Sequence, residues 1–456
     1  MKNSFLTTRY TDDIYQLIIN LCVKDIDKKN EEINIDVIKL KKFPDIFFLL
    51  ICFKYLLQGK FFDKQKIVLL EYKKVNFGKK LLSITYRNFN SYVSVLNYFY
   101  TLFKNVYIIG KTIKTANYYV KNYKFKYVYI DHIEYLNGIY FDIFKSKKRT
   151  IYTNHYPNNI IKTTNKNAET TYKIPFKKKK ILGKQKKQIK KIANRVYGSI
   201  ENHLPWMRHT EWSNKEYKNL DKYDYIIYAH SFTDYQLGYG FDGFTNTLEW
   251  LIFTIEELRK RKVNFIIKPH PNFYNEKNMD IFAKWDKEIY LILKKKIGNS
   301  PNILFLDEPI LNRNLISKLN KKCITISKHG SIQFEMIHHN FKVISSNCNL
   351  IDSRYSLTNS WKNKIEYKKL LNKKWNDLKF ANKNNFLIVN ELLFLNKNST
   401  FGKNFFLNVL TKYMLKKKLI SKNSPNFEYL ETLSRFSSLK NKEDIIKNIK
   451  IPIQTI

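Results

Sequence analysis

The sequence predicts an α/β protein built from two doubly wound halves. Short runs rich in Val, Ile and Tyr alternate with amphipathic stretches, the pattern of βαβ units around a parallel sheet. A length of 456 residues is typical of two domains. We expect an N-terminal helical segment at 1–60, a first doubly wound domain at 61–200, a second at 201–359, and a C-terminal helical region at 360–456.

The chain is strongly basic. It carries 82 Lys+Arg against 39 Asp+Glu, a formal net charge of +43. Such an excess attracts phosphates, acidic glycans, nucleic acid and anionic lipid. The sequence is also heavy in Lys, Asn and Ile, so compositional drift explains much of the charge and ranks ahead of a specific polyanion partner. Hydrophobic residues at 44% and aromatics at 16% exclude a disordered chain.

The cysteines and the apolar runs indicate the cellular compartment in which the protein is expected. The four cysteines form no CxxC pair, so they predict neither a disulfide framework nor a zinc motif and fit a reducing cytosol. The N-terminus lacks the apolar core of a signal peptide. The best apolar run, 46–57, is interrupted by Lys54 and is too short to span a bilayer. We expect a cytoplasmic protein whose membrane contact is peripheral, at the inner face, through basic and aromatic surface.

The first half contains four strand candidates, with spacers between the first three that are long enough for crossover helices. They are 66–72, 105–110, 126–132 and 150–155. A very basic stretch at 172–200 is expected to be a solvated helix or an interdomain connection, with a patch for anionic lipid or a charged acceptor as the alternative.

The second half has a clearer βαβ series. Strands are expected at 224–230, 263–268, 303–309, 323–331 and 341–346, and helices at 246–261, 280–296 and 331–338. Doubly wound sheets bind ligands at the carboxyl ends of their strands, so the residues that follow these strands are the site candidates.

The first candidate cluster is Lys268-Pro269-His270-Pro271-Asn272. The two prolines fix the exit from the strand and remove backbone donors. An ammonium and an imidazole held there suit a phosphate or diphosphate leaving group. The structural alternative is that His270 only closes a turn.

The second cluster is Ser327-Lys328-His329-Gly330-Ser331, with Glu335 in the helix that follows. Gly330 permits a tight strand-to-helix turn, and Ser331 is a good N-cap beside N–H groups that favour an anion. Glu335 is suited to accept hydrogen bonds from ribose or base hydroxyls. The structural alternative is a helix cap with a solvated acid.

The third cluster is His230-Ser231-Phe232-Thr233-Asp234, followed by a glycine-containing loop with Asp242. Asp234 or Asp242 is suited to supply a carboxylate for sugar chemistry, although either could instead be a helix cap. Each cluster alone is more often structural than functional, but together they stand at successive strand ends.

These motifs carry a family resemblance over residues 220–350. The order AHSFTDYQLGYGFDGF, LEWLIFTIEEL, FIIKPHPN, ISKHGSIQFE and KVISS resembles bacterial capsule and surface-polysaccharide biosynthesis proteins, GT-B-like glycosyltransferases that include Kdo transferases. The His-Pro element is similar to that of bacterial sialyltransferases that use CMP-sugars. In the first half, IDHIEYLNGIY (130–140) resembles an acceptor-domain loop. The resemblance implies two Rossmann-like domains facing across a cleft, additional helices at both termini, and no cofactor or metal.

The resemblance also implies roles for individual residues. His270 and Lys268 would contact the departing phosphate, and Glu335 the ribose or base. Asp234 would match the nucleophilic carboxylate of retaining Kdo transferases, with Asp131 as an alternative base, although the surrounding HSFTDYQ differs from those enzymes. The sequence also departs from the family after Glu335, where His338-His339-Asn340 replaces a small residue and Gly. The full nucleotide-sugar set is Lys268, Asn272, Ser327, His329, Gly330, Ser331 and Glu335.

The resulting hypothesis is a metal-independent glycosyltransferase. It would move Kdo or another CMP-activated acidic sugar to a capsule polysaccharide or glycolipid acceptor. One alternative is a glycerophosphotransferase that uses CDP-glycerol. Another is a non-enzymatic polyanion binder, but the sequence has no helix-turn-helix, RNP-type or zinc-finger signature, so no nucleic-acid partner is expected. His329, His338 and His339 lack carboxylate or Cys partners at a useful spacing, so no metal site is expected.

Overall fold

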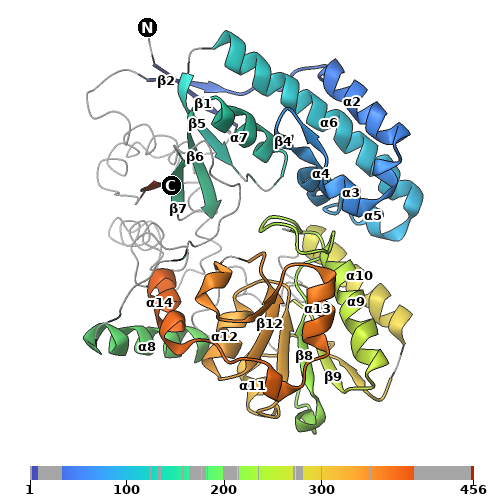
Figure 1. The fold of residues 1–456 in the computed structure, drawn as a ribbon, viewed down its shortest axis with the longest axis vertical. Helices are drawn as coiled ribbons and strands as arrows, with labels where there is room; N and C mark the ends of the chain where they lie inside the picture. The colour runs from blue at the N-terminus through green and yellow to red at the C-terminus, as the bar shows by residue number, and fades with distance from the viewer. Residues whose placement is uncertain are drawn as a thin grey trace.

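The computed structural model arranges the chain as two lobes, each built on a six-stranded sheet (Figure 1). The residues it describes are 3–8, 33–123, 125–131, 133, 135–156, 159–163, 176, 181, 183–198, 213, 215–234, 236–270, 273, 281–298, 300–349, 351–394 and 453–455. No helix in this part of the chain is long and apolar enough to cross a membrane.

The second lobe contains an entirely parallel sheet in the order β10-β9-β8-β11-β12-β13. Numbered along the chain, this is the 3-2-1-4-5-6 order of dinucleotide-binding folds, whose topological switch point lies between the first and fourth strands. Here that point lies between β8 and β11. The strands are β8 Tyr225–Tyr228, β9 Phe265–Lys268, β10 Ile303–Phe305, β11 Ile324–Ser327, β12 Lys342–Ser346 and β13 Asn359–Trp361.

Helices cover both faces of this sheet and bury its central strands on both sides. In β8, Tyr225 and Ile227 pack into one apolar cluster while Ile226 and Tyr228 pack into the other. The first cluster includes residues of α9 (Thr247–Lys260), α10 (Ile281–Ile297) and α13 (Lys364–Leu371). The second includes residues of α8 (Gly183–Gly198), α11 (Asn312–Ile316), α12 (Ile332–His338) and α14 (Lys383–Phe394).

The first lobe contains a mixed sheet in the order β14-β7-β6-β5-β1-β2, parallel except for the β6–β7 pair. Its strands are β1 Asn3–Thr7, β2 Ile33–Val37, β5 Phe125–Asp131, β6 Thr150–Tyr156, β7 Asn159–Thr163 and β14 Ile453–Thr455, with a separate hairpin of β3 Glu71–Tyr72 and β4 Val75–Asn76. Its helices are α2 Ile46–Leu57, α3 Lys64–Val68, α4 Phe77–Thr85, α5 Asn90–Val93, α6 Val95–Asn122 and α7 Asn137–Ser146.

The predicted α/β class with two Rossmann-like sheets is confirmed. In the second half, every predicted strand and helix is present within a few residues of its expected position. The strands predicted at 126–132 and 150–155 are β5 and β6, and part of the basic stretch at 172–200 is the helix α8.

Several predictions for the first lobe are wrong. Residues 105–110 lie inside the 28-residue helix α6, where the buried residues recur every three or four positions and follow the helical period. Residues 66–72 form the end of α3 and the short strand β3. The segment 1–60 is not only helical, because β1 and β2 belong to the first sheet; β14 in the C-terminal region joins the opposite edge of that sheet.

The two lobes touch through aromatic and polar side chains. Phe89 of the first lobe stacks on Trp285 of α10 with ring centroids 6.5 Å apart. The Gln65 amide donates to the carbonyl of Gly243 at 3.1 Å, and the Tyr92 hydroxyl donates to the carbonyl of Phe232. These contacts bring the first lobe against the loops that follow β8.

Candidate functional site

Three histidines meet at the carboxyl edge of the second sheet. His230, His270 and His329 follow β8, β9 and β11, which are adjacent strands. The His230 ring lies between the other two, with its centroid 4.2 Å from that of His329 and 5.5 Å from that of His270. Tyr239 adds a fourth ring, 5.4 Å from His329. The cluster therefore flanks the switch point, where doubly wound sheets bind ligands.

Burial keeps these imidazoles neutral. Desolvation, opposed by the charge of Asp234, lowers the pKa of His230 to about 4. Desolvation and the neighbouring His230 and Lys268 lower the pKa of His270 to about 3, and the pKa of His329 lies well below its usual value for similar reasons. Neither ring nitrogen of His329, nor Nδ1 of His230, has a hydrogen-bond partner in the described part of the chain.

Two buried lysines accompany the histidines. Lys268, at the end of β9, has a pKa lowered to about 8 by burial, an effect that the charge of Glu335 opposes. Burial in turn raises the pKa of Glu335, while hydrogen bonding from Asn312 and the charge of Lys268 lower it. Lys328, at the end of β11, has its ammonium 3.5 Å from a carboxylate oxygen of the fully buried Asp242. The edge thus holds two cations, each with one carboxylate near it.

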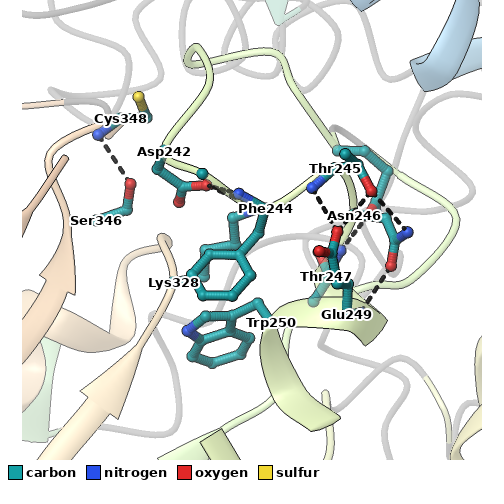
Figure 2. A network of polar contacts seen from close by, with 12 residues as sticks. Asp242, Phe244, Thr245, Asn246, Thr247, Glu249, Trp250, Lys328, Ser346 and Cys348 are labelled. Carbon is teal, nitrogen blue, oxygen red and sulfur yellow. Dashed lines mark hydrogen bonds and ion pairs between the residues drawn. The ribbon is translucent and has the colours of Figure 1, made fainter. Parts of the chain in front are cut away.

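The loop that carries Asp242 is fixed by its own polar contacts (Figure 2). Asp242 accepts a hydrogen bond from the backbone N–H of Phe244 at 3.2 Å, and Thr245 donates to Glu249. Gly243 has φ +96°, and a Cβ there would lie 2.7 Å from the backbone nitrogen of Lys364, so this position requires glycine. Asp242 is therefore a buried partner of Lys328 rather than an exposed carboxylate for sugar chemistry.

Asp286 of α10 organises the loop after β8. Its carboxylate accepts four hydrogen bonds, from the backbone N–H groups of Phe232 and Thr233 at 2.9 and 2.8 Å, and from the hydroxyls of Ser231 and Thr233 at 2.5 and 2.9 Å. Burial raises the pKa of Asp286 to about 7, and the four donors act in the opposite direction. This acid fixes the backbone between His230 and Asp234.

Asp234 lies at the boundary between the lobes. Its side chain is exposed and accepts a hydrogen bond from the hydroxyl of Tyr135, which belongs to the first lobe. The guanidinium carbon of Arg87 sits 4.3 Å from the centroid of the Tyr135 ring and 4.4 Å from that of Phe282 in α10. Asp131, the alternative base, is the last residue of β5, but its side chain is outside the described residues.

The turn after β11 is built as a tight connection. Gly330 has φ +114°, and a Cβ there would lie 3.6 Å from Cδ2 of His230. The Ser327 hydroxyl is buried and donates to the carbonyl of His329 at 2.9 Å, so it shapes the turn. Ser331 occupies the N-cap position of α12 but its exposed side chain makes no capping hydrogen bond, contrary to the expectation of a side-chain cap.

The structure thus brings most of the candidate set together. His270, His329 and Gly330 surround His230, while Lys268 and Glu335 interact beside them. Asn272 lies outside the described residues. Within the described part of the chain, no group of three His, Cys, Asp or Glu side chains is arranged to hold a metal ion.

Sequence reasoning did not identify some residues that shape this site. Asp286 stands in an amphipathic helix, and its only signal is an acid on the buried face, at a position where Ala283, Ile289 and Tyr290 are also buried. Arg87 follows a helix without any motif. His230 stands at a predicted strand end without a motif that indicates a role, yet it is the centre of the ring cluster.

Comparison with known proteins gives only distant likenesses. No family model and no curated protein matches the chain. A KpsC from Thermosulfurimonas dismutans, described as a beta Kdo 2,4 transferase, is 8% identical with a TM-score of 0.35, over 58% of this chain and 79% of that one. A UDP-GlcNAc 2-epimerase from Methanocaldococcus jannaschii, solved with UDP-GlcNAc and UDP, is 14% identical with a TM-score of 0.24, over 85% and 98%. A second structure of that epimerase has 15% identity and a TM-score of 0.23. Structural similarity at these TM-scores does not identify the function of the chain.

Proposed function

We propose that the protein is a nucleotide-sugar-dependent glycosyltransferase whose donor phosphate binds at the edge formed by His230, His270 and His329. The observation that carries the proposal is the convergence of three imidazoles and two lysines at the switch point of the second sheet. Nδ1 of His230 and the ring nitrogens of His329 are buried without a hydrogen-bond partner in the described part of the chain, which is costly, and a phosphate oxygen would accept a hydrogen bond from an N–H group there.

The cluster suits departure of a phosphate from an anomeric carbon. As that bond breaks, negative charge grows on the phosphate oxygens, and donors already in place around them lower the barrier. His270 and His329 would donate hydrogen bonds from opposite sides of His230, and Lys268 would add a positive charge. A bound phosphate would also raise the pKa of the neighbouring imidazoles, so that one of them can carry a proton as the phosphate leaves.

The carboxylate that acts on the sugar is assigned to Asp234. It follows the same strand as His230, it is exposed, and Tyr135 of the other lobe holds it. It would attack the anomeric carbon or deprotonate an acceptor hydroxyl. Asp131 is the alternative base. Glu335 would contact the ribose or base through its half-buried carboxyl group.

The donor class is a proposal that rests on motif resemblance. The His-Pro element after β9 and the His-Gly-Ser turn with Glu335 favour a CMP-activated acidic sugar such as Kdo, with a capsule polysaccharide or glycolipid as acceptor. A carbohydrate donor and a glycerophosphate donor would present the same phosphate to the cluster, so product analysis has to separate them.

A donor screen tests the proposal. Purified protein is incubated with CMP-Kdo, CMP-sialic acid, CDP-glycerol and UDP-sugars together with a set of glycan acceptors, and products are identified by mass. A glycosylated product that disappears in a folded His270→Ala variant supports the proposal. A glycerophosphate product would reassign the transferred group. Full activity of folded His270→Ala with the true donor would contradict the proposal that the histidine cluster binds the donor phosphate.

A further inference from the structure

The first lobe has an apolar outer face on α2 that the site does not use. Ile46, Phe47, Leu50, Phe53 and Leu57 recur along the helix and are all exposed, Phe47 by 66% and Leu57 by 74%. Phe48 and Cys52 bury the opposite side. An isolated exposed apolar residue is ordinary, but a complete helix face of Phe, Leu and Ile is not.

The long helix α6 extends this apolar surface. Leu96, Tyr100, Phe103 and Tyr107 are exposed at helical spacing, Leu96 by 81%. Figure 1 draws α2 and α6 side by side in the first lobe, and the backbone N–H of Asp45, just before α2, donates to the carbonyl of Gly110 in α6 at 3.0 Å.

Aromatic rings connect the short 3-10 helix Lys60–Phe62, which follows α2, to α6. The ring of the exposed Phe62, just after α2, lies 5.6 Å from that of Phe99, and Phe99 lies 6.3 Å from Phe103. We call the exposed apolar residues of α2 and α6, together with Phe62, the α2–α6 face.

The charged side chains of these two helices are all basic. Neither α2 nor α6 contains an Asp or Glu, while Lys54 of α2 and Lys104 of α6 are exposed next to apolar residues of the face. Lys60 and Lys111 lie over the rings of Tyr55 and Tyr107, at 4.5 and 5.8 Å from the ring centroids. A lysine has a long apolar stem, so its ammonium can reach anionic headgroups while a neighbouring aromatic ring is inserted in the bilayer.

We propose that the α2–α6 face docks on an anionic lipid bilayer. Apolar side chains would enter the boundary between headgroups and acyl chains, and the lysines would meet the negative surface potential. A second copy of the chain is a poorer fit, because self-association would bring the lysines of both copies together without acids on either helix to neutralise them. The proposal stands apart from the assignment of the transferase site, since it uses none of the site residues.

Vesicle sedimentation of the full chain tests this docking. We expect binding to vesicles that contain phosphatidylglycerol, weak binding to pure phosphatidylcholine, and a marked loss in high salt. Phe47→Ser combined with Phe53→Ser should lower vesicle binding at least tenfold while leaving the melting temperature nearly unchanged, because both side chains are exposed. Lys54→Gln with Lys104→Gln should remove most of the preference for phosphatidylglycerol.

The matched control is Leu291→Ser with Ile292→Ser, which changes two exposed apolar residues of α10 outside the face. This control should bind vesicles like the unmodified protein. Equal vesicle binding by the Phe47/Phe53 variant and the unmodified protein would overturn the proposal. A second result would also overturn the bilayer proposal: no vesicle binding, and a dimer in light scattering that the Phe47/Phe53 changes dissociate. That result would make the α2–α6 face an interface between copies of the chain.

Discussion

The rings of His230 and His329 lie 4.2 Å apart in an edge-to-face contact, at the ends of two adjacent strands that flank the switch point of the second sheet. Nδ1 of His230 and both ring nitrogens of His329 are buried without a hydrogen-bond partner among the described residues. Such groups lose solvation without compensation, which is a cost that a structural role alone would not explain. A ligand with several acceptor oxygens would recover it.

The buried histidines should make the fold sensitive to acid. A histidine titrates near 6.5 in an unfolded chain, whereas the pKa of His230 is about 4 and that of His270 about 3 in the fold. Between these values the unfolded state binds more protons, so the free energy of unfolding should fall as the pH drops below about 6.5. Each histidine contributes up to about 1.4 kcal/mol per pH unit in that interval.

Urea unfolding from pH 7.5 to 4.5 checks this, with and without His230→Asn. The variant should show a smaller loss of stability with acid than the unmodified protein. The same acid dependence in both would mean that folding leaves the pKa of His230 at its ordinary value.

Asp286 should be essential for the loop that leads to Asp234. Asp286→Ala leaves the backbone N–H groups of Phe232 and Thr233 buried without an acceptor, which costs about 1–3 kcal/mol for each group. The control is Asp307→Ala, whose exposed pair with Lys294 is worth at most about 1 kcal/mol. Denaturant unfolding measures both, and an Asp286→Ala variant as stable as Asp307→Ala would contradict the assignment.

The hydrogen bond from Tyr135 to Asp234 should matter for transfer and little for folding. Tyr135→Phe removes one hydroxyl at the lobe boundary, and a hydrogen bond to a charged group is worth about 1.5–3 kcal/mol, roughly a ten- to hundredfold change in rate if Asp234 reacts. We expect kcat to fall while the melting temperature stays within about two degrees. Tyr107→Phe, on the exposed face of α6, is the control. An unchanged kcat in Tyr135→Phe would contradict a catalytic role for Asp234.

The sequence predicted the second lobe far better than the first. In the second lobe β8, β9 and β11 are short apolar runs, and Pro269 after β9 and Gly330 after β11 mark where the loops begin, so hydrophobic pattern and turn residues predict the same boundaries. The Asn246 cap of α9, which accepts from the N–H of Glu249 at 2.8 Å, is one such boundary. In the first lobe, NVYIIG has the composition of a strand, but its neighbours in α6 continue the helical period through Leu102, Val106, Ile109 and Ile113. Packing of that long helix overrides the β propensity of six residues.

The candidate site was predictable where it follows strand ends and not where it depends on tertiary contacts. His270, His329 and Gly330 follow directly from the rule that ligands bind at the carboxyl edge of a doubly wound sheet. That His230 would form the centre of the ring cluster required the strand order, because β8 lies between β9 and β11. Asp286 acts through residues far away in the chain, so no local pattern points to it. Tyr135 belongs to the segment 130–140 that resembles an acceptor-domain loop, but its contact with Asp234 joins residues 99 positions apart and has no local signal.

The most direct measurement is the binding of cytidine monophosphate by titration calorimetry to the unmodified protein, His270→Ala and His338→Ala. His338 lies in α12, packs against Tyr197, and serves as a histidine outside the ring cluster. We expect His270→Ala to weaken binding at least tenfold and His338→Ala to bind like the unmodified protein. Equal affinity for all three proteins would place the nucleotide phosphate elsewhere and contradict the account.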